Sequence, residues 1–146
     1  MNTLSLDRAP AAGAPLGIVA ALARVLLALM FVLGGIGKFA NLDGTAGYIA
    51  SAGLPLASLL APASALLELG GGLALIVGFQ ARWAALALAL FTLLASVLFH
   101  RFWTVPPAQA MVAQLLFMKN IAVTGGMLMV VAMGAGPLSL DARRAR

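Results

Sequence analysis

The chain has 146 residues, of which 63% are hydrophobic and 9% charged, and its formal net charge at pH 7 is +5. Ordinary water-soluble domains contain about 45–50% apolar and about 25% charged residues. Too few polar side chains remain here to cover a water-facing surface. The basic residues are scattered and form no dense basic face, which argues against nucleic-acid binding. Composition therefore predicts a single-domain integral membrane protein.

The chemistry available to the chain is narrow. It contains no cysteine and one histidine, His100. A disulfide and an iron–sulfur cluster are therefore excluded, as is haem ligation by two histidines of one chain. We expect no metal site and no intrinsic cofactor.

Four apolar segments are long enough to cross a bilayer, which takes about 20 mostly apolar residues. Glycine, proline, asparagine and aspartate separate them, as is typical of turns. The predicted spans are 16–37, 56–78, 83–99 and 110–134. They predict an all-α fold, an integral membrane four-helix bundle over residues 16–136, between an N-terminal segment, 1–15, and a basic tail, 137–146.

The distribution of arginine predicts the direction of insertion. An even number of spans puts both termini on one side of the membrane. The boundary residues of the other side include only two basic residues, Lys38 and Arg101. Because basic residues collect on the cytoplasmic side, we expect both termini, and the turn between the second and third spans, to be cytoplasmic. The basic residues on that side are Arg8, Arg82, Arg143, Arg144 and Arg146.

One face of the first span carries two cations. Arg24 and Lys38 lie on the same helical face, because Ala28, Phe31 and Gly35 continue the spacing of three or four residues between them. A charged side chain that faces lipid costs several kcal/mol, so we expect this face to point into the bundle. For Lys38, at the boundary, a side chain that snorkels to the membrane surface is an equally open interpretation.

The second and fourth spans carry ionisable residues at middle depth. Glu68 lies in the second span, and Lys119 and Asn120 lie in the fourth. A bare carboxylate in hydrocarbon would be protonated, so we predict that Glu68 pairs with Arg24 or Lys119. Such a pair would serve structure as readily as function.

The third span carries a polar stripe. Thr92, Ser96 and His100 recur every fourth residue, and Arg101 follows at the outer end. Convergence of this stripe with the charged faces predicts one polar pocket open to the outer side, although each residue alone is also typical of a packing or boundary position. The predicted pocket residues are Lys38, Glu68, His100, Arg101, Lys119 and Asn120.

Short motifs resemble a known family. They occur in one order over about residues 18–135, and none is specific alone. The motifs are GGIGK at 34–38, AGLP at 52–55, ELGGG at 68–72, GFQARWAA at 78–85, FHRFW at 99–103 and FMKN at 117–120. In their order and spacing, the chain resembles the DoxX family of small bacterial membrane proteins.

The resemblance implies a multi-pass protein of the bacterial inner membrane and a role linked to redox enzymes. Related proteins resemble the quinone-reactive subunit of thiosulfate:quinone oxidoreductase, while a wider circle of similar four-helix proteins includes membrane chaperones and cargo receptors. The leading prediction is a redox-associated membrane subunit with a quinone-sized pocket. Because no group in the chain performs redox chemistry unaided, it would be at most a quinone-reactive subunit that needs a partner electron donor.

Two alternatives stay open. The chain would serve as a non-catalytic scaffold, assembly factor or chaperone if its small-residue helix faces bind another membrane protein. It would serve as a transporter if a small solute passes through the positively charged interior of the bundle. Four spans are few for alternating access, so a transporter would need an oligomer. The expected partners are therefore membrane lipid, quinone, and a redox enzyme or other membrane protein.

Overall fold

The structure is a computed structural model that describes residues 14–145. Within this range all regular secondary structure is helical, which confirms the predicted fold class. The helices are α1 (Ala14–Ala40), α2 (Leu42–Ser51), α3 (Ala57–Val77), α4 (Ala81–Phe99), α5 (Pro107–Met133) and α6 (Leu140–Arg144). Two arginines used for the topology prediction, Arg8 and Arg146, lie outside the described residues, as does most of the predicted segment 1–15.

Four helices, α1, α3, α4 and α5, are long and apolar enough to cross a membrane. Their bounds differ from the predicted spans by at most three residues at either end. Large apolar side chains cover their outward faces, as Leu26 and Leu115 illustrate. A surface of this kind is stable in contact with lipid and not with water.

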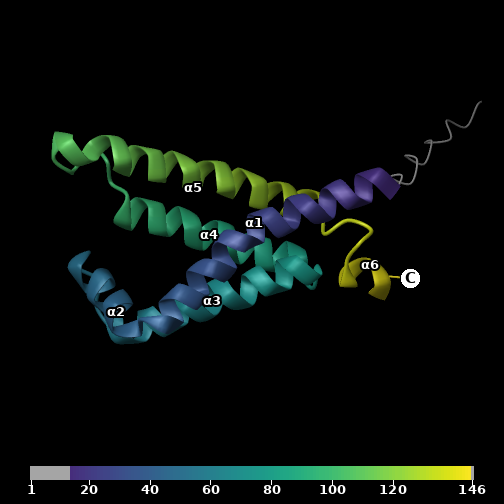
Figure 1. The fold of residues 1–146 in the computed structure, drawn as a ribbon, viewed down its shortest axis with the longest axis horizontal. Coiled ribbons are helices and arrows are strands. Elements are labelled where there is room, and N and C mark those ends of the chain that lie inside the picture. Colours follow the sequence, from purple (N-terminus) through teal and green to yellow (C-terminus); the bar gives the residue numbers. More distant parts are fainter. Residues whose placement is uncertain (1–13, 146) are drawn as a thin grey trace, which may run out of the picture.

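The four long helices form two antiparallel pairs, α1 with α3 and α4 with α5 (Figure 1). The pairs meet where α3 turns into α4 and diverge toward α2 (Figure 1). We call the end that carries α2 and the α4–α5 connection the loop end. The opposite end, where α1 begins, α3 turns into α4 and α5 stops, is the terminal end.

Glycines bring α1 and α3 into close contact. A Cβ built on Gly35 would lie 2.7 Å from the backbone nitrogen of Leu69, and one on Gly72 would lie 2.8 Å from a methyl carbon of Val32. Small residues of this kind allow helices in a membrane to approach closely. The contact fixes the register of the pair, so that Gly34 faces Glu68.

The first connection contains a helix that the sequence analysis treated as a loop. Asn41 caps the start of α2, because its side-chain oxygen accepts a hydrogen bond from the backbone nitrogen of Gly44 at 2.9 Å. The helix stops before Gly53, whose φ of 78° lies in the left-handed region. Ile49 is the buried residue of α2, so the helix packs on the bundle through one side.

Arg24 connects three segments at the terminal end. Its guanidinium donates to the backbone oxygen of Ile76 at 3.2 Å, to that of Leu138 at 3.0 Å, and to that of Ala135. The carbonyls at the end of a helix lack intrahelical partners. Arg24 therefore caps the end of α3 and holds the chain after α5 against α1.

Asp141 completes the same end. Its carboxylate accepts from the backbone nitrogens of Gln80 and Ala81, at 2.8 and 2.9 Å. These nitrogens begin α4 and have no partner within the helix. The predicted basic tail is thus anchored to the bundle through α6. Gly78, which ends α3 with φ of 68°, has no room for a side chain, because a Cβ there would lie 2.4 Å from Cβ of Ser139.

Replacing Arg24 with methionine tests whether this residue fixes the terminal end. We expect Arg24→Met to lower stability in mild detergent by about 2 kcal/mol or more, because hydrogen bonds from a charged group contribute about 1.5–3 kcal/mol each. Thermal melting of the purified protein measures the change. The exposed Arg101→Met is the matched control and should melt like the parent. Equal melting temperatures for both variants would contradict this role.

Candidate functional site

A cavity of about 600 Å³ lies between the two helix pairs and reaches from the loop end toward the middle of the bundle. Helices α1, α2, α3, α4 and α5 all contribute to its wall. Most of the lining is apolar, with polar groups concentrated in a few places. The polar and charged residues that line it are Lys38, Thr45, Tyr48, Ser64, Glu68, Thr92, His100, Lys119 and Asn120.

Lys38 and Glu68 form an ion pair across α1 and α3. It is the one ion pair found among residues 14–145. The structure therefore corrects the prediction that Glu68 pairs with Arg24 or Lys119. The antiparallel register explains the difference, because it places Arg24 at the terminal end beside Ile76, far from the middle of α3.

The geometry of α1 explains how a boundary lysine reaches mid-membrane. A helical side chain leans toward the N-terminus of its helix and covers the residue four positions earlier. For Lys38 that residue is Gly34, which faces Glu68: a Cβ built on Gly34 would lie 3.0 Å from Oε2 of Glu68. The missing side chain at Gly34 leaves room for the carboxylate. Lys38 thus points into the bundle, and its snorkelling alternative does not hold.

Lys119 and His100 lie on the facing wall. Lys119 comes from the middle of α5 and His100 from the end of α4, and both line the cavity. Burial, and secondly the positive charge of Lys119, hold the pKa of His100 below its ordinary value. His100 is therefore neutral at pH 7, which leaves one ring nitrogen as a donor and the other as an acceptor.

The lining carries a surplus positive charge. Two lysines, Lys38 and Lys119, and one glutamate, Glu68, line the cavity. Since Glu68 is bound to Lys38, no carboxylate in the described lining neutralises Lys119. A ligand oxygen that is anionic or rich in electron density would be attracted to this ammonium group.

Five of the six predicted pocket residues meet in this cavity, and the sixth does not. Arg101 is exposed on the connection between α4 and α5 and is absent from the lining. Beside it, the rings of Phe102, Trp103 and Phe117 contact one another edge to face, with centroids 5.0–5.7 Å apart. The aromatic cluster braces the α4–α5 connection at the rim.

The contribution of α2 to the cavity was not predicted from the sequence. Tyr48 of this helix stacks on Phe99 of α4, with ring centroids 5.0 Å apart, and both residues line the cavity. This contact bridges the two helix pairs at the loop end. A signal for α2 was present, because an asparagine followed by an acidic residue in the first turn is typical of a helix start.

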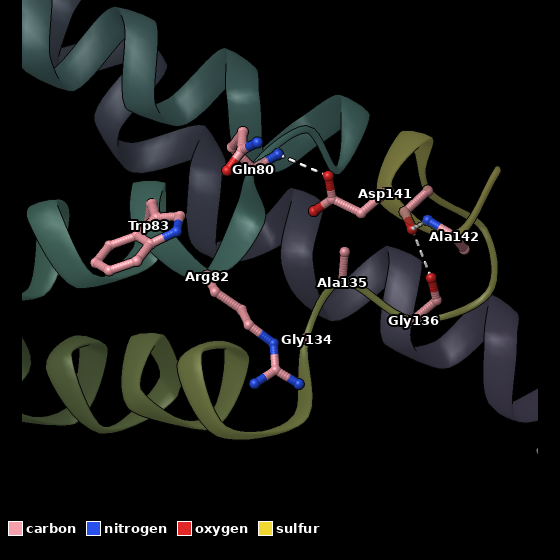
Figure 2. A pocket seen from close by; sticks show the side chains of 9 residues that line it. Gln80, Arg82, Trp83, Gly134, Ala135, Gly136, Asp141 and Ala142 are labelled. Atoms are coloured by element: carbon pink, nitrogen blue, oxygen red, sulfur yellow. Dashed lines mark hydrogen bonds between the residues drawn. The ribbon is translucent and has the colours of Figure 1, made fainter. Parts of the chain in front are cut away.

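A second cavity, of about 350 Å³, lies at the terminal end and is shown in Figure 2. Arg82 points along it toward Gly134, while Asp141 lies against the start of α4 (Figure 2). The chain itself uses the main polar groups here, since Asp141 caps α4 and the hydroxyl of Ser139 donates to the backbone oxygen of Gly136 at 2.6 Å. We therefore assign this region to the structure and the larger cavity to function.

A double-mutant cycle tests the ion pair. Lys38→Met should lower stability by about 1–3 kcal/mol, because it leaves Glu68 as a largely buried, unpaired carboxylate. Adding Glu68→Gln should recover part of the loss. Thermal melting in detergent provides the readout, and Lys119→Met, which breaks no ion pair among the described residues, is the matched control. Strictly additive losses from the two substitutions would show that the two residues do not interact.

Comparison with known proteins identifies the family. The DoxX family model matches residues 19–101, and the model described as the SURF4 family matches residues 64–146. Inner membrane protein YqjF of Escherichia coli (strain K12) is 40% identical over 119 residues, which cover 82% of this chain and 86% of that protein. Inner membrane protein YphA of the same organism is 31% identical over 131 residues, which cover 90% of this chain and 94% of that protein. No solved structure shows significant similarity.

With its four membrane-spanning helices, the chain belongs to the DoxX family and is a multi-pass protein of the bacterial inner membrane.

Proposed function

We propose that this protein is a redox-associated membrane subunit that binds a quinone in the loop-end cavity. The single observation that carries the proposal is the cavity itself: an apolar chamber of about 600 Å³ in which polar groups lie on opposite walls. Ligand sites for small molecules typically have volumes of about 300–1,000 Å³ and combine an apolar lining with a few placed polar groups.

The distribution of polar groups suits a quinone better than a fully polar solute. A quinone has two carbonyl oxygens on a flat ring and a long apolar tail. Lys119 and Asn120 supply donors on α5, and His100 supplies a donor or acceptor on α4. Apolar residues such as Phe91 and Leu67 face the remaining space and would contact the ring and the tail.

Electron transfer in this proposal requires a second protein. The side chains around the cavity can bind a quinone, orient it and exchange protons with it, but none of them stores electrons. A partner redox enzyme would therefore supply or accept the electrons, and this chain would hold the quinone within the membrane.

A solute transporter is less well supported. A route through the bundle would have to continue from the cavity to the terminal end. The fully buried side chains of Leu75, Leu88 and Met127 fill the core on that side. Beyond them, Arg24 links α1 to the end of α3 and to the chain just after α5. The cavity thus does not continue to the terminal end, as a transport route through the bundle would require.

We further propose that the loop end faces the periplasm and both termini face the cytoplasm. Of the basic residues in the described chain, Arg82, Arg143 and Arg144 lie at the terminal end, and basic residues mark the cytoplasmic side. A reporter fused after Arg146 should be active only as a cytoplasmic reporter, and one inserted at Gly47 only as an external reporter. The opposite pattern would show that the loop end, and with it the cavity, faces the cytoplasm.

Retention of quinone by the purified protein tests the function. The protein, extracted from bacterial membranes in mild detergent, should carry quinone that is detectable by ultraviolet absorbance after solvent extraction. Lys119→Met should reduce the bound amount about tenfold, because a charge-assisted hydrogen bond contributes about 1.5–3 kcal/mol.

The control removes a polar side chain from the same helix away from the cavity. Gln114 is exposed and does not line the cavity, so Gln114→Met should retain as much quinone as the parent. If the parent carries no more quinone than an unrelated membrane protein and co-purifies instead with another membrane protein, a scaffold or chaperone replaces the proposed function.

A further inference from the structure

Helices α4 and α5, which pack against each other, carry four buried small polar residues that we call the row. Thr92 and Ser96 come from α4, and Asn120 and Thr124 come from α5. All four are buried, with exposed fractions between 0 and 6%. Burial of a polar group without a hydrogen bond is costly, so the partners of each member decide what the row does.

Two members of the row are satisfied by their own helices. The hydroxyl of Ser96 donates to the backbone oxygen of Thr92 at 2.7 Å, and that of Thr124 donates to the backbone oxygen of Asn120 at 2.8 Å. Neither Ser96 nor Thr124 lines the cavity. These two residues are explained by packing alone.

The other two members have polar groups to spare. The hydroxyl of Thr92 is buried and has no hydrogen-bond partner within the described residues. The carboxamide of Asn120 likewise makes no hydrogen bond to the described part of the chain. Both residues line the cavity. Thr92 lies eight positions before His100, about 12 Å farther from the loop end at the rise of a straight helix.

We propose that Thr92 and Asn120 form a deep subsite that hydrogen-bonds one oxygen of the ligand. This inference rests on the proposed function, because it requires that the cavity bind a quinone. A ligand would bind with its ring deepest, so that one ring oxygen reaches this pair and the tail lies against the apolar lining of the cavity.

The chemistry of the pair suits both redox forms of a quinone. A hydroxyl and a carboxamide can each donate or accept a hydrogen bond, whereas a lysine ammonium group can only donate. Thr92 and Asn120 can therefore donate to the carbonyl of a quinone and accept from the hydroxyl of a quinol. The ammonium group of Lys119 cannot accept a hydrogen bond from the hydroxyl of a quinol. The deep subsite would thus hold the ring in place while its oxidation state changes.

The row provides a matched pair of variants. Thr92→Val removes the unpartnered hydroxyl, and Thr124→Val removes a hydroxyl of the same kind, equally buried, that is bonded within its own helix. Thr92→Ser keeps the hydroxyl. Each variant is reconstituted into nanodiscs of quinone-free lipid, and its affinity for decylubiquinone and decylubiquinol is measured together with its melting temperature without ligand.

We expect Thr92→Val to weaken binding of both forms about 3- to 10-fold, the equivalent of one ordinary hydrogen bond. Its melting temperature without ligand should equal that of the parent or exceed it, because an unsatisfied buried group has been removed. Thr92→Ser and Thr124→Val should bind like the parent.

Unchanged affinity in Thr92→Val would overturn the subsite while leaving quinone binding intact. A loss confined to the quinone or to the quinol would contradict a subsite that serves both forms. If Thr92→Val melts markedly lower without ligand, the hydroxyl stabilises the fold and the inference is likewise overturned. If the parent binds neither form, the proposed function fails, and the subsite fails with it.

Discussion

A carboxylate halfway along a membrane-spanning helix is the constraint on which the rest of this structure depends. A buried charge without a partner is costly, and Lys38 supplies the opposite charge that Glu68 contacts. The pair is possible because Gly34 leaves space beneath the carboxylate and because glycines hold α1 and α3 in close register. Because Glu68 is paired with Lys38, no carboxylate in the described lining is left to pair with Lys119 on the opposite wall.

The polar groups at the two ends of the bundle have different surroundings. At the terminal end, Arg24 and Asp141 are bonded to backbone groups at the end of α3, at the start of α4 and in the chain after α5, so this end is closed by the chain itself. Toward the loop end the helix pairs diverge, and polar groups such as Lys119 and Asn120 in the middle of α5 face the cavity. This difference is our physical reason for placing the function at the loop end.

Sequence periodicity was sufficient for the helices and for the inward face of α1, since Arg24 and the small and aromatic residues spaced from it are buried as expected. It also predicted that Glu68, His100 and Lys119 lie on converging helix faces, and all three line the cavity. Periodicity could not predict which residue forms the ion pair with Glu68. That partner depends on the register of α1 against α3, which glycine contacts determine. The anchoring of α6 was missed for a related reason: Asp141 bonds to nitrogens about 60 positions earlier in the chain.

The central claim is that a cavity open at the loop end reaches mid-membrane, and cysteine labelling tests it most directly because the natural chain has no cysteine. Ser64→Cys places a thiol in the cavity wall, while Leu66→Cys places one on the outward face of the same helix. We expect a membrane-impermeant thiol reagent added to the loop-end side to modify the first variant rapidly and the second hardly at all. Equal protection of both thiols would contradict the account.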